Sequence, residues 1–393
     1  MSVPASLLLP SYSLGYYFQL AALALGGIGS ARDIVSLYNT TNYKNLTSKA
    51  LDKIAIVKTG NRLNSYGTTD IANTLCSVLD EPRYMYNAVI DSDFPSNIFK
   101  LALDAKLITA GSSLSNKSMC HMAAVYVDLL SNNIIPQGSV KLPMLMRATV
   151  FGRTRGPSAV DLASTPASLN SVGLAILGAL AAYLGSARVG GSRYEYYAVP
   201  DGSSKSLALY EVVLEVLGGV IGKGGISVPD AWRVFTDIGG VATDLATYLA
   251  VLVRLTESDN TVSKALALAK GRAFESLILI RLEASGNRPL VAWAGSVAVS
   301  ESLVDISGKK LDRIFQDMYS LARIALKSSV KQFPKAVSLC VNSLATASIA
   351  TTSDEAKSSL LSDCARSLSS LLDERNLNAA ERTLIGRVLQ NLR

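Results

Sequence analysis

The chain has 393 residues, of which 49% are hydrophobic and 18% are charged, and its formal net charge is +7 at pH 7. This composition excludes a disordered protein, and the length predicts two or three domains with a sizeable core. The basic balance favours an anionic partner. Residues 1–160 carry 14 Lys and Arg against 9 Asp and Glu, and residues 301–393 carry 13 against 10, so both ends of the chain are basic.

The N-terminal stretch is uncharged as far as residue 31, and residues 14–31 approach the length of a membrane span. A signal peptide would need a basic segment before this stretch, but the first basic residue, Arg32, follows it. Gln19 and the many small residues favour a buried helix instead. We therefore expect a cytoplasmic protein with no membrane partner.

Helix and strand signals alternate through the first 160 residues, where β-branched runs favour strands and apolar residues three or four apart favour helices. In chain order, the predicted elements are a helix over 14–27 that ends at Gly26-Gly27, strands at 33–38 and 52–58, a helix capped by Thr69 or Asp70 that ends near Leu79, helices over 97–108 and 118–130, and an extended segment over 140–151.

The rest of the chain changes from mixed to purely helical patterns near residue 300. In chain order, the predicted elements are a small-residue helix at 171–185, a tyrosine-rich strand at 193–200, a helix over 204–217, a hairpin around A-S-G-N within 274–299, and helices near 301–331, 336–350, 354–373 and 378–392. The predicted fold class is α+β, with a mixed N-terminal α/β body that carries short strands and a hairpin, followed by a C-terminal helical bundle. The predicted domains are residues 1–160, 161–300 and 301–393.

Catalytic and cofactor signals are weak. His121 is the only histidine, which limits acid-base chemistry, and a lone helical histidine beside Met and Cys is typical of packing or capping. The glycine-rich run at 216–225 departs from a phosphate-binding loop at both ends. Four scattered cysteines without metal-ligand spacing are expected to be buried free thiols. We therefore expect no enzyme activity, no metal and no cofactor.

Basic residues gather in two segments. No carboxylate lies between Asp128 and Asp161, and three arginines fall in that gap, so the segment needs a distant partner inside the fold or an anionic partner outside it. Residues 38–67 carry five cations against Asp52 alone, with asparagines and with Tyr38, Tyr43 and Tyr66 as stacking faces. The candidate nucleic-acid-binding residues are Arg147, Arg153, Arg155, Lys49, Lys53, Lys58 and Arg62.

The order of elements also resembles a known family. Four features together are similar to the large subunit of archaeal type I-A CRISPR interference (Cascade) complexes: an N-terminal helix that leads to short strands, the small-residue helix, the strand Y-E-Y-Y-A-V-P that follows it, and the helical C-terminus. The resemblance implies a non-enzymatic subunit that works with crRNA, target DNA, and backbone and small subunits. It also implies a contact with duplex DNA near the protospacer-adjacent motif and recruitment of a helicase-nuclease. It carries no individual residue of the family onto this chain.

A second hypothesis comes from a different class of protein. High hydropathy, low charge and abundant Ser, Ala and Gly are also typical of a structural or assembly protein, such as a nucleocapsid-like or scaffold subunit with large apolar interfaces. Such a protein is expected to bind nucleic acid without sequence preference, or not at all, and to form regular homo-oligomers. A large subunit of a mixed complex is expected to stay monomeric or to be poorly soluble alone.

Overall fold

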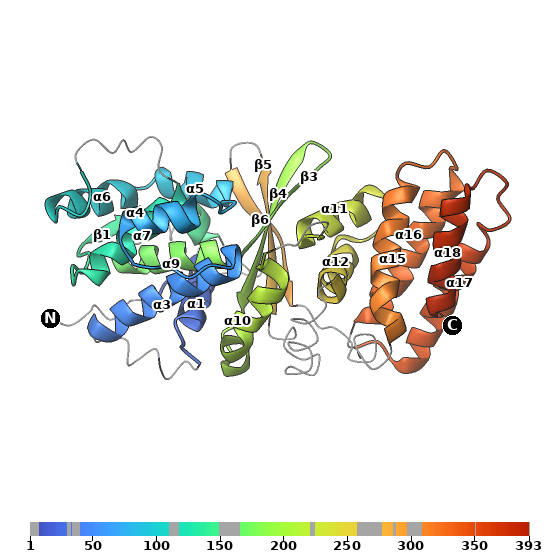
Figure 1. Ribbon diagram of the computed structural model, residues 1–393, viewed down its shortest axis with the longest axis horizontal. Helices are drawn as coiled ribbons and strands as arrows, with labels where there is room; N and C mark the ends of the chain where they lie inside the picture. Colours follow the sequence, from blue (N-terminus) through green and yellow to red (C-terminus); the bar gives the residue numbers. More distant parts are fainter. Residues whose placement is uncertain are drawn as a thin grey trace. The chain divides into compact units, whose positions relative to one another are not determined.

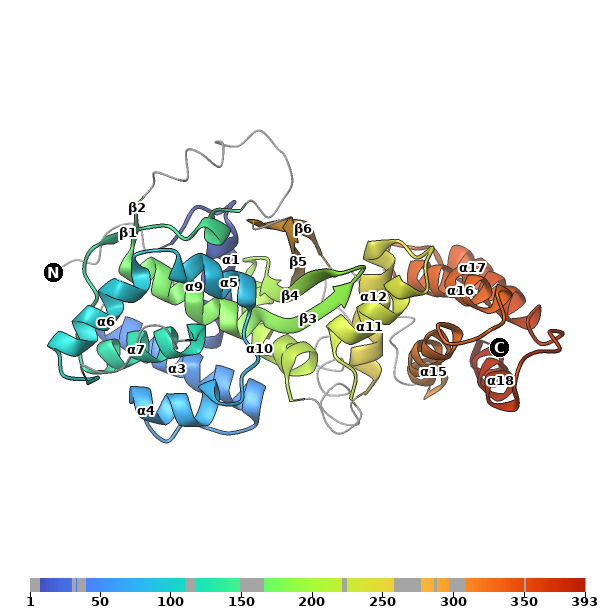
Figure 2. The same ribbon diagram turned by 90° about the horizontal axis from the view of Figure 1, so that it is seen from above.

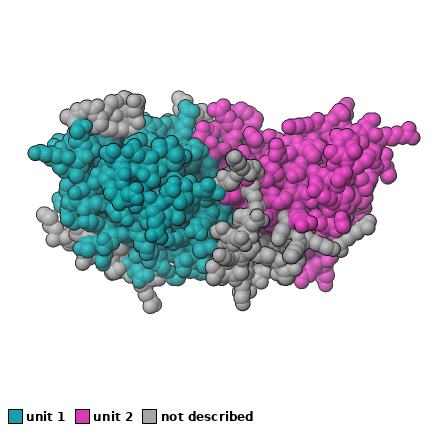
Figure 3. Space-filling view, viewed as in Figure 1, with its two compact units in different colours: residues 1–185, 194–220, 276–295 teal, residues 186–193, 221–275, 296–393 magenta. Residues whose placement is uncertain are grey.

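The computed structural model describes residues 8–29, 33, 40–109, 118–148, 166–220, 225–257, 277–285, 288–296, 309–349 and 351–392. The chain forms two compact units (Figure 3). Unit 1 comprises residues 1–185, 194–220 and 276–295, and unit 2 comprises residues 186–193, 221–275 and 296–393. Each unit is assembled from separate stretches of the chain, whereas the domains expected from the sequence are three consecutive ranges. Those three domains stay a prediction.

Unit 1 consists of helices, a pair of short strands and most of a four-stranded sheet (Figure 1). Its elements outside that sheet are α1 (Leu14–Leu25), α3 (Thr40–Thr59), α4 (Thr68–Ile71), a π-helical turn η2 (Ala72–Cys76), α5 (Arg83–Ile90), α6 (Phe94–Asp104), α7 (Met119–Ser131), β1 (Ser139–Lys141), a 3-10 turn η4 (Met144–Arg147), β2 (Pro166–Ser168), α9 (Leu169–Ala182) and α10 (Ser204–Gly218).

Helices α1 and α9 form the centre of the unit 1 core. All residues of α9 are buried, and Ser13 and Ser168 accept backbone N–H hydrogen bonds at the starts of α1 and α9. A Cβ added at Gly178 would lie 1.6 Å from the carbonyl oxygen of Phe18. Glycine therefore lets the two backbones approach as closely as they do.

The larger sheet contains β3 (Tyr183–Val189), β4 (Ser192–Pro200), β5 (Leu277–Ser285) and β6 (Arg288–Ser296), in that order. Strands β4 and β5 pair antiparallel, with Tyr194 opposite Glu283 and Pro200 opposite Leu277. The predicted strand at 193–200 is therefore confirmed. The two arms of the expected hairpin are the neighbours β5 and β6, whereas its turn residues 286 and 287 lie outside the described residues.

Unit 2 contains the C-terminal helical bundle. Its helices are α11 (Val228–Asp237), α12 (Thr243–Glu257), α15 (Lys309–Ala325), α16 (Gln332–Ser348), α17 (Asp354–Ser369) and α18 (Ala379–Leu392). Helix α15 packs against α18, α16 packs against α17, and α12 contacts both α15 and α16 (Figure 2). The α+β fold class and the helical C-terminus agree with the sequence analysis.

The predicted strand at 52–58 is wrong, because these residues belong to the 20-residue helix α3. Leu46, Ala50, Ile54 and Val57 are buried at helical spacing, so the apolar period of the longer segment outweighs the β preference of a short run. The predicted strand at 33–38 lies outside the described residues except for Asp33.

Two further boundaries differ from the prediction. The helix expected from Thr69 or Asp70 begins at Thr68, after Gly67, and turns into the π-helical turn η2. Of the extended segment expected over 140–151, the structure describes residues 140–148, and within these only the end of β1 is a strand, since Pro143 is followed by the 3-10 turn η4.

The cysteines differ from the expectation of free thiols. Cys76 in η2 is joined to Cys120 in α7, with Cα atoms 5.4 Å apart, and Cys340 in α16 is joined to Cys364 in α17. Each disulfide connects two elements that are already packed together. The correction arises because the fold brings together cysteines that are 44 and 24 residues apart in the chain.

The apolar N-terminal stretch forms the buried helix that the sequence favoured. Helix α1 has 12 residues, and the side chain of Gln19 accepts a hydrogen bond from the backbone of Leu9 and donates one to the carbonyl of Ser171. Every helix among the described residues is too short or too polar to cross a bilayer.

Candidate nucleic-acid interface

Helix α3 places four lysines around one 20-residue helix. Successive residues are turned by about 100° in a helix with 3.6 residues per turn, so Lys49 and Lys53, four apart, lie on neighbouring parts of its surface. Lys44 is half-buried and donates a hydrogen bond to the Asn133 side chain over 3.3 Å. The lysines of α3 therefore do not form one continuous row.

Two of the predicted contact residues bind partners inside unit 1. Lys53 forms an ion pair with Glu211 of α10. The amino group of Lys58 donates to the carbonyl oxygen of Tyr183 at 2.5 Å. Tyr183 is the C-cap of α9, so this amino group binds a carbonyl at the helix end where the backbone leaves acceptors unpaired. Both lysines thus join α3 to neighbouring helices.

Burial changes the protonation of Lys58. Its amino group is enclosed by protein, and this burial lowers its pKa to about 7, while the nearby Asp80 carboxylate acts in the opposite direction. A Cβ at Gly218, the last residue of α10, would lie 2.8 Å from the Lys58 nitrogen. The amino group therefore lies against the C-terminal ends of two helices, where a cation is favoured.

Lys49 and Arg62 are the two predicted residues in this segment whose side chains are exposed. The Lys49 side chain lies over Gly27, where a Cβ would come within 2.6 Å of the lysine nitrogen, and the φ of +99° at Gly27 also favours glycine. Asn45 and Asn61 are exposed on the same segment. These four side chains can donate hydrogen bonds to phosphate oxygens, and the amides can also reach sugars or base edges.

Among the described tyrosines of this segment, Tyr43 does not form the expected stacking face. Tyr43 is only 5% exposed, and its hydroxyl forms a short hydrogen bond with that of Tyr126. The carbonyl oxygen of Asn170 lies 3.1 Å and 3.2 Å from the two hydroxyls and accepts the proton that their mutual hydrogen bond leaves over. Burial raises the pKa of Tyr43 and of Tyr126 well above the ordinary value. Tyr66 is half-buried, and Tyr38 lies outside the described residues. An aromatic side chain on an amphipathic helix can face the core or the solvent, and tertiary packing places Tyr43 in the core.

Of the predicted arginine segment, the structure describes only Arg147. Its Nε donates to the carbonyl of Leu142 at 2.6 Å, which fastens η4 to the chain just before it, and partial burial lowers its pKa. Arg153 and Arg155 lie outside the described residues.

His121 has a structural role at the start of α7. Its ring Nδ1 is 2.7 Å from the hydroxyl of Ser118, and its backbone N–H donates to the same hydroxyl, so the pair closes the helix N-terminus. The Glu81 carboxylate accepts hydrogen bonds from the N–H groups of Met119 and Cys120, the two residues before His121. Within the described residues, no three His, Cys, Asp or Glu side chains gather as a metal site requires.

Comparisons of the sequence with protein-family models and with curated proteins find no match to this chain.

Proposed function

We propose that this protein is a non-catalytic nucleic-acid-binding subunit of a crRNA-guided antiviral surveillance complex in the cytoplasm. In this proposal it contacts duplex DNA near the protospacer-adjacent motif and helps to recruit a helicase-nuclease. Its partners are crRNA, target DNA and the backbone and small subunits of the complex. The proposal is supported by the resemblance of the chain to the large subunit of type I-A CRISPR interference complexes. The elements of that resemblance include the small-residue helix α9, the tyrosine-rich strand β4 and the helical C-terminus.

The observation that carries the proposal is the exposed side of α3 and the segment after it. Lys49 and Arg62 are exposed there together with Asn45 and Asn61. Among the described residues, neither cation has a carboxylate within 4.0 Å. A surface of cations and amides without local counterions fits a phosphate backbone, since Lys and Arg neutralise phosphates.

The roles of the two cations differ in this proposal. The planar guanidinium of Arg62 can pair with two acceptors on a guanine edge, whereas Lys49 acts as a point charge on the backbone. Lys53 and Lys58 support the interface indirectly, because they hold α3 against α10 and α9.

The test is the salt dependence of binding to labelled duplex DNA, measured for the wild type and for Lys49→Ala/Arg62→Ala. Loss of two phosphate contacts should make the slope of log K against log salt shallower by about 2. The control is Lys53→Ala, which removes a lysine that is four residues from Lys49 but is paired with Glu211. It should leave the slope unchanged while lowering stability. Absence of DNA binding, or equal slopes in the double variant and the wild type, would count against the proposal.

The arginine segment is tested in the same assay with Arg147→Ala/Arg153→Ala/Arg155→Ala. A slope that is shallower by about 2 to 3 would assign the segment to DNA. An unchanged slope with reduced stability would assign it to the fold. If the protein binds no DNA and forms regular homo-oligomers in light scattering, the structural or assembly function replaces the proposed one.

A further inference from the structure

A second basic surface lies in unit 2, where α15 ends and α16 begins. The chain carries no Asp or Glu from residue 318 to residue 353. Four cations fall in this stretch, and all four are exposed. We call this surface the α15–α16 corner, and its cations are Arg323, Lys327, Lys331 and Lys335.

The four cations are spaced four residues apart, which places them in two neighbouring pairs. Arg323 lies in the last turn of α15, which ends at Ala325. Lys327 lies in the turn that follows, where its N–H donates to the Ile324 carbonyl. Lys331 is the N-cap of α16, with helical backbone angles, and Lys335 lies one turn further on. Side chains four apart on a helix have Cβ atoms about 5 to 6 Å from each other.

One aromatic ring holds the first of these cations in place. The Arg323 guanidinium lies over the ring of Tyr319, one turn earlier on α15, with 5.7 Å between its central carbon and the ring centroid. The ring contact restrains the guanidinium without neutralising it. The charge thus stays available to a partner in solution.

Carboxylates on the neighbouring elements do not neutralise the corner. Asp317 of α15 is 3.9 Å from Arg387, and Asp354 of α17 is 3.0 Å from Lys357. Further carboxylates near the ends of helices in this unit include Asp237 of α11, Asp244 of α12, and Asp373 and Glu374 after α17. In the part of the chain that the structure describes, none of these groups is within 4.0 Å of a corner cation.

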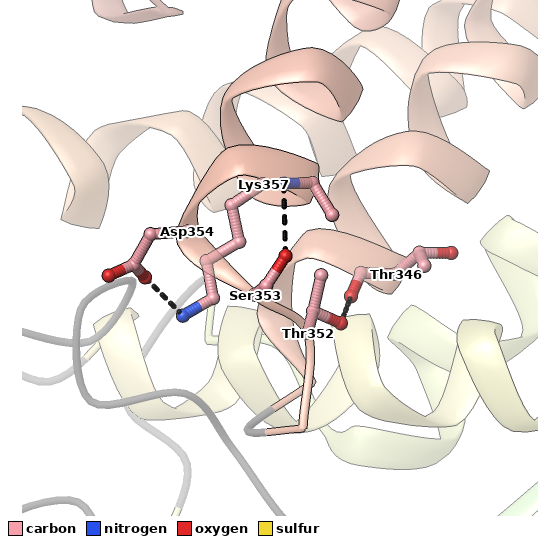
Figure 4. A network of polar contacts seen from close by, with 6 residues as sticks. Thr346, Thr352, Ser353, Asp354 and Lys357 are labelled. Carbon is pink, nitrogen blue, oxygen red and sulfur yellow. Dashed lines mark hydrogen bonds and ion pairs between the residues drawn. The ribbon is translucent and has the colours of Figure 1, made fainter.

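The start of α16 is also unfavourable for lysines. A helix N-terminus carries partial positive charge and favours acidic residues. Figure 4 shows the start of α17, where the backbone N–H of Lys357 donates to the carbonyl oxygen of Ser353. The Lys357 amino group donates to the carboxylate of Asp354, an acidic residue in the first turn of this helix. Helix α16 has no acidic residue in its first turn and no side-chain cap. Lys331 and Lys335 therefore oppose the stability of α16 unless an external anion balances them.

We infer that the α15–α16 corner binds the phosphate backbone of nucleic acid, without sequence preference. Four uncompensated cations fit a series of phosphates, and lysines supply point charges in place of a readout of base edges. Tyr319 is buried, so among the corner residues no ring is exposed for base stacking. Leu326 and Leu339, which are 40% and 52% exposed beside the cations, add apolar contact with sugars. Lys49 and Arg62 belong to unit 1 and the corner residues belong to unit 2, and the inference uses none of the residues on which the proposed function rests.

The experiment uses the full chain with all four corner cations changed, Arg323→Gln/Lys327→Gln/Lys331→Gln/Lys335→Gln. Binding to a labelled duplex of random sequence is measured by fluorescence anisotropy over a series of salt concentrations. The slope of log K against log salt should become shallower by about 3 to 4, and affinity at about 50 mM salt should fall on the order of tenfold or more. The melting temperature should stay equal or rise, because the lysines at the start of α16 are removed.

The matched control removes the same charge from exposed positions elsewhere, with Arg83→Gln/Lys100→Gln/Lys106→Gln/Arg366→Gln. An equal change of slope in this control would overturn the inference, because net charge alone would explain it. An unchanged slope in the corner variant, or no DNA binding by the wild type, would also overturn it. So would a corner variant that keeps DNA binding but loses binding to phosphatidylserine vesicles, since the corner would then be a membrane-surface site.

The two nucleic-acid interfaces can be told apart in one series. If only the corner variant changes the slope, the inference stands and the α3 interface fails. If only Lys49→Ala/Arg62→Ala changes it, the inference fails and the α3 interface stands.

Discussion

The amino group of Lys58 donates a hydrogen bond of 2.5 Å to the backbone carbonyl of Tyr183, so a lysine near the end of α3 closes the C-terminal end of α9. The same amino group lies beside Gly218 at the end of α10. Three helices of unit 1 therefore end around one enclosed amino group.

The stability of the protein should depend on pH through Lys58. Its pKa is about 7 in the folded chain and about 10.5 in the unfolded chain. Above about pH 10.5 neither state binds this proton, and the full stability is present. As the pH falls toward 7, the unfolded chain binds the proton first, so the free energy of unfolding declines and then levels off below pH 7.

The variant Lys58→Met removes this dependence. Between pH 7 and pH 9 the wild type should gain free energy of unfolding relative to the variant, because only the wild type carries the titrating amino group. Urea unfolding of both proteins at pH 7, 8 and 9 measures the difference. A difference that stays constant over this range would contradict the lowered pKa. The variant should also keep the salt slope of DNA binding, since Lys58 is enclosed.

Gly178→Ala should be strongly destabilising. The new methyl group would meet the Phe18 carbonyl oxygen at 1.6 Å, and the helix backbones of α1 and α9 would have to separate. Forcing an extra methyl into a packed core costs about 1 to 3 kcal/mol, and a clash with backbone belongs at the upper end. Chemical denaturation measures the loss. The matched control is Gly386→Ala in α18, where nothing lies within 4 Å and alanine should stabilise the helix by about 0.5 to 1 kcal/mol.

Removal of the disulfide between η2 and α7 should also lower stability. The double variant Cys76→Ser/Cys120→Ser opens a loop of 44 residues and should lose about 2 to 4 kcal/mol relative to the oxidised protein. In excess reductant the wild type should approach the variant. Mass spectrometry after alkylation without reductant should find these two thiols blocked in the wild type, and free thiols at both positions would refute the pairing.

Glu81→Ala should weaken the start of α7. The carboxylate accepts hydrogen bonds of 3.0 Å and 2.8 Å from the N–H groups of Met119 and Cys120, which have no partner within the helix. Loss of such a cap costs about 1 to 2 kcal/mol. Thermal unfolding measures it against Asp91→Ala, where an exposed carboxylate follows α5. Equal melting temperatures for the two variants would show that Glu81 contributes nothing as a cap.

The sequence predicted best those elements whose signals are local. The helices predicted over 118–130, 171–185 and 204–217 lie within a few residues of α7, α9 and α10. In the structure Ser118, Ser168 and Ser203 accept N–H hydrogen bonds at the starts of these helices. Pro200 ended β4 as expected. The short β-branched run at 52–58 favours a strand when it is taken alone. The apolar spacing of the longer segment around it is helical, and the segment forms α3.

The interface itself could be predicted only in part. The scarcity of acids in residues 38–67 was visible, and it indicated the segment to which Lys49 and Arg62 belong. A stretch of 36 residues without Asp or Glu, which contains Arg323 and Lys335, carries the same signal. What could not be read from the sequence was which cations would be occupied inside the fold.

By itself the sequence determined the α+β class, the helical C-terminus and the positions of helices such as α7, α9 and α10, because these depend on residues within a few positions of one another. It did not predict α3, α5, α11 or α12. Only the tertiary structure decided that Lys53 pairs with Glu211, Lys58 with Tyr183, and Tyr43 with Tyr126. These partners lie 158, 125 and 83 residues apart in the chain. A side chain's availability to a ligand depends on what the whole fold packs around it, and contacts at such separations leave no pattern in the local sequence.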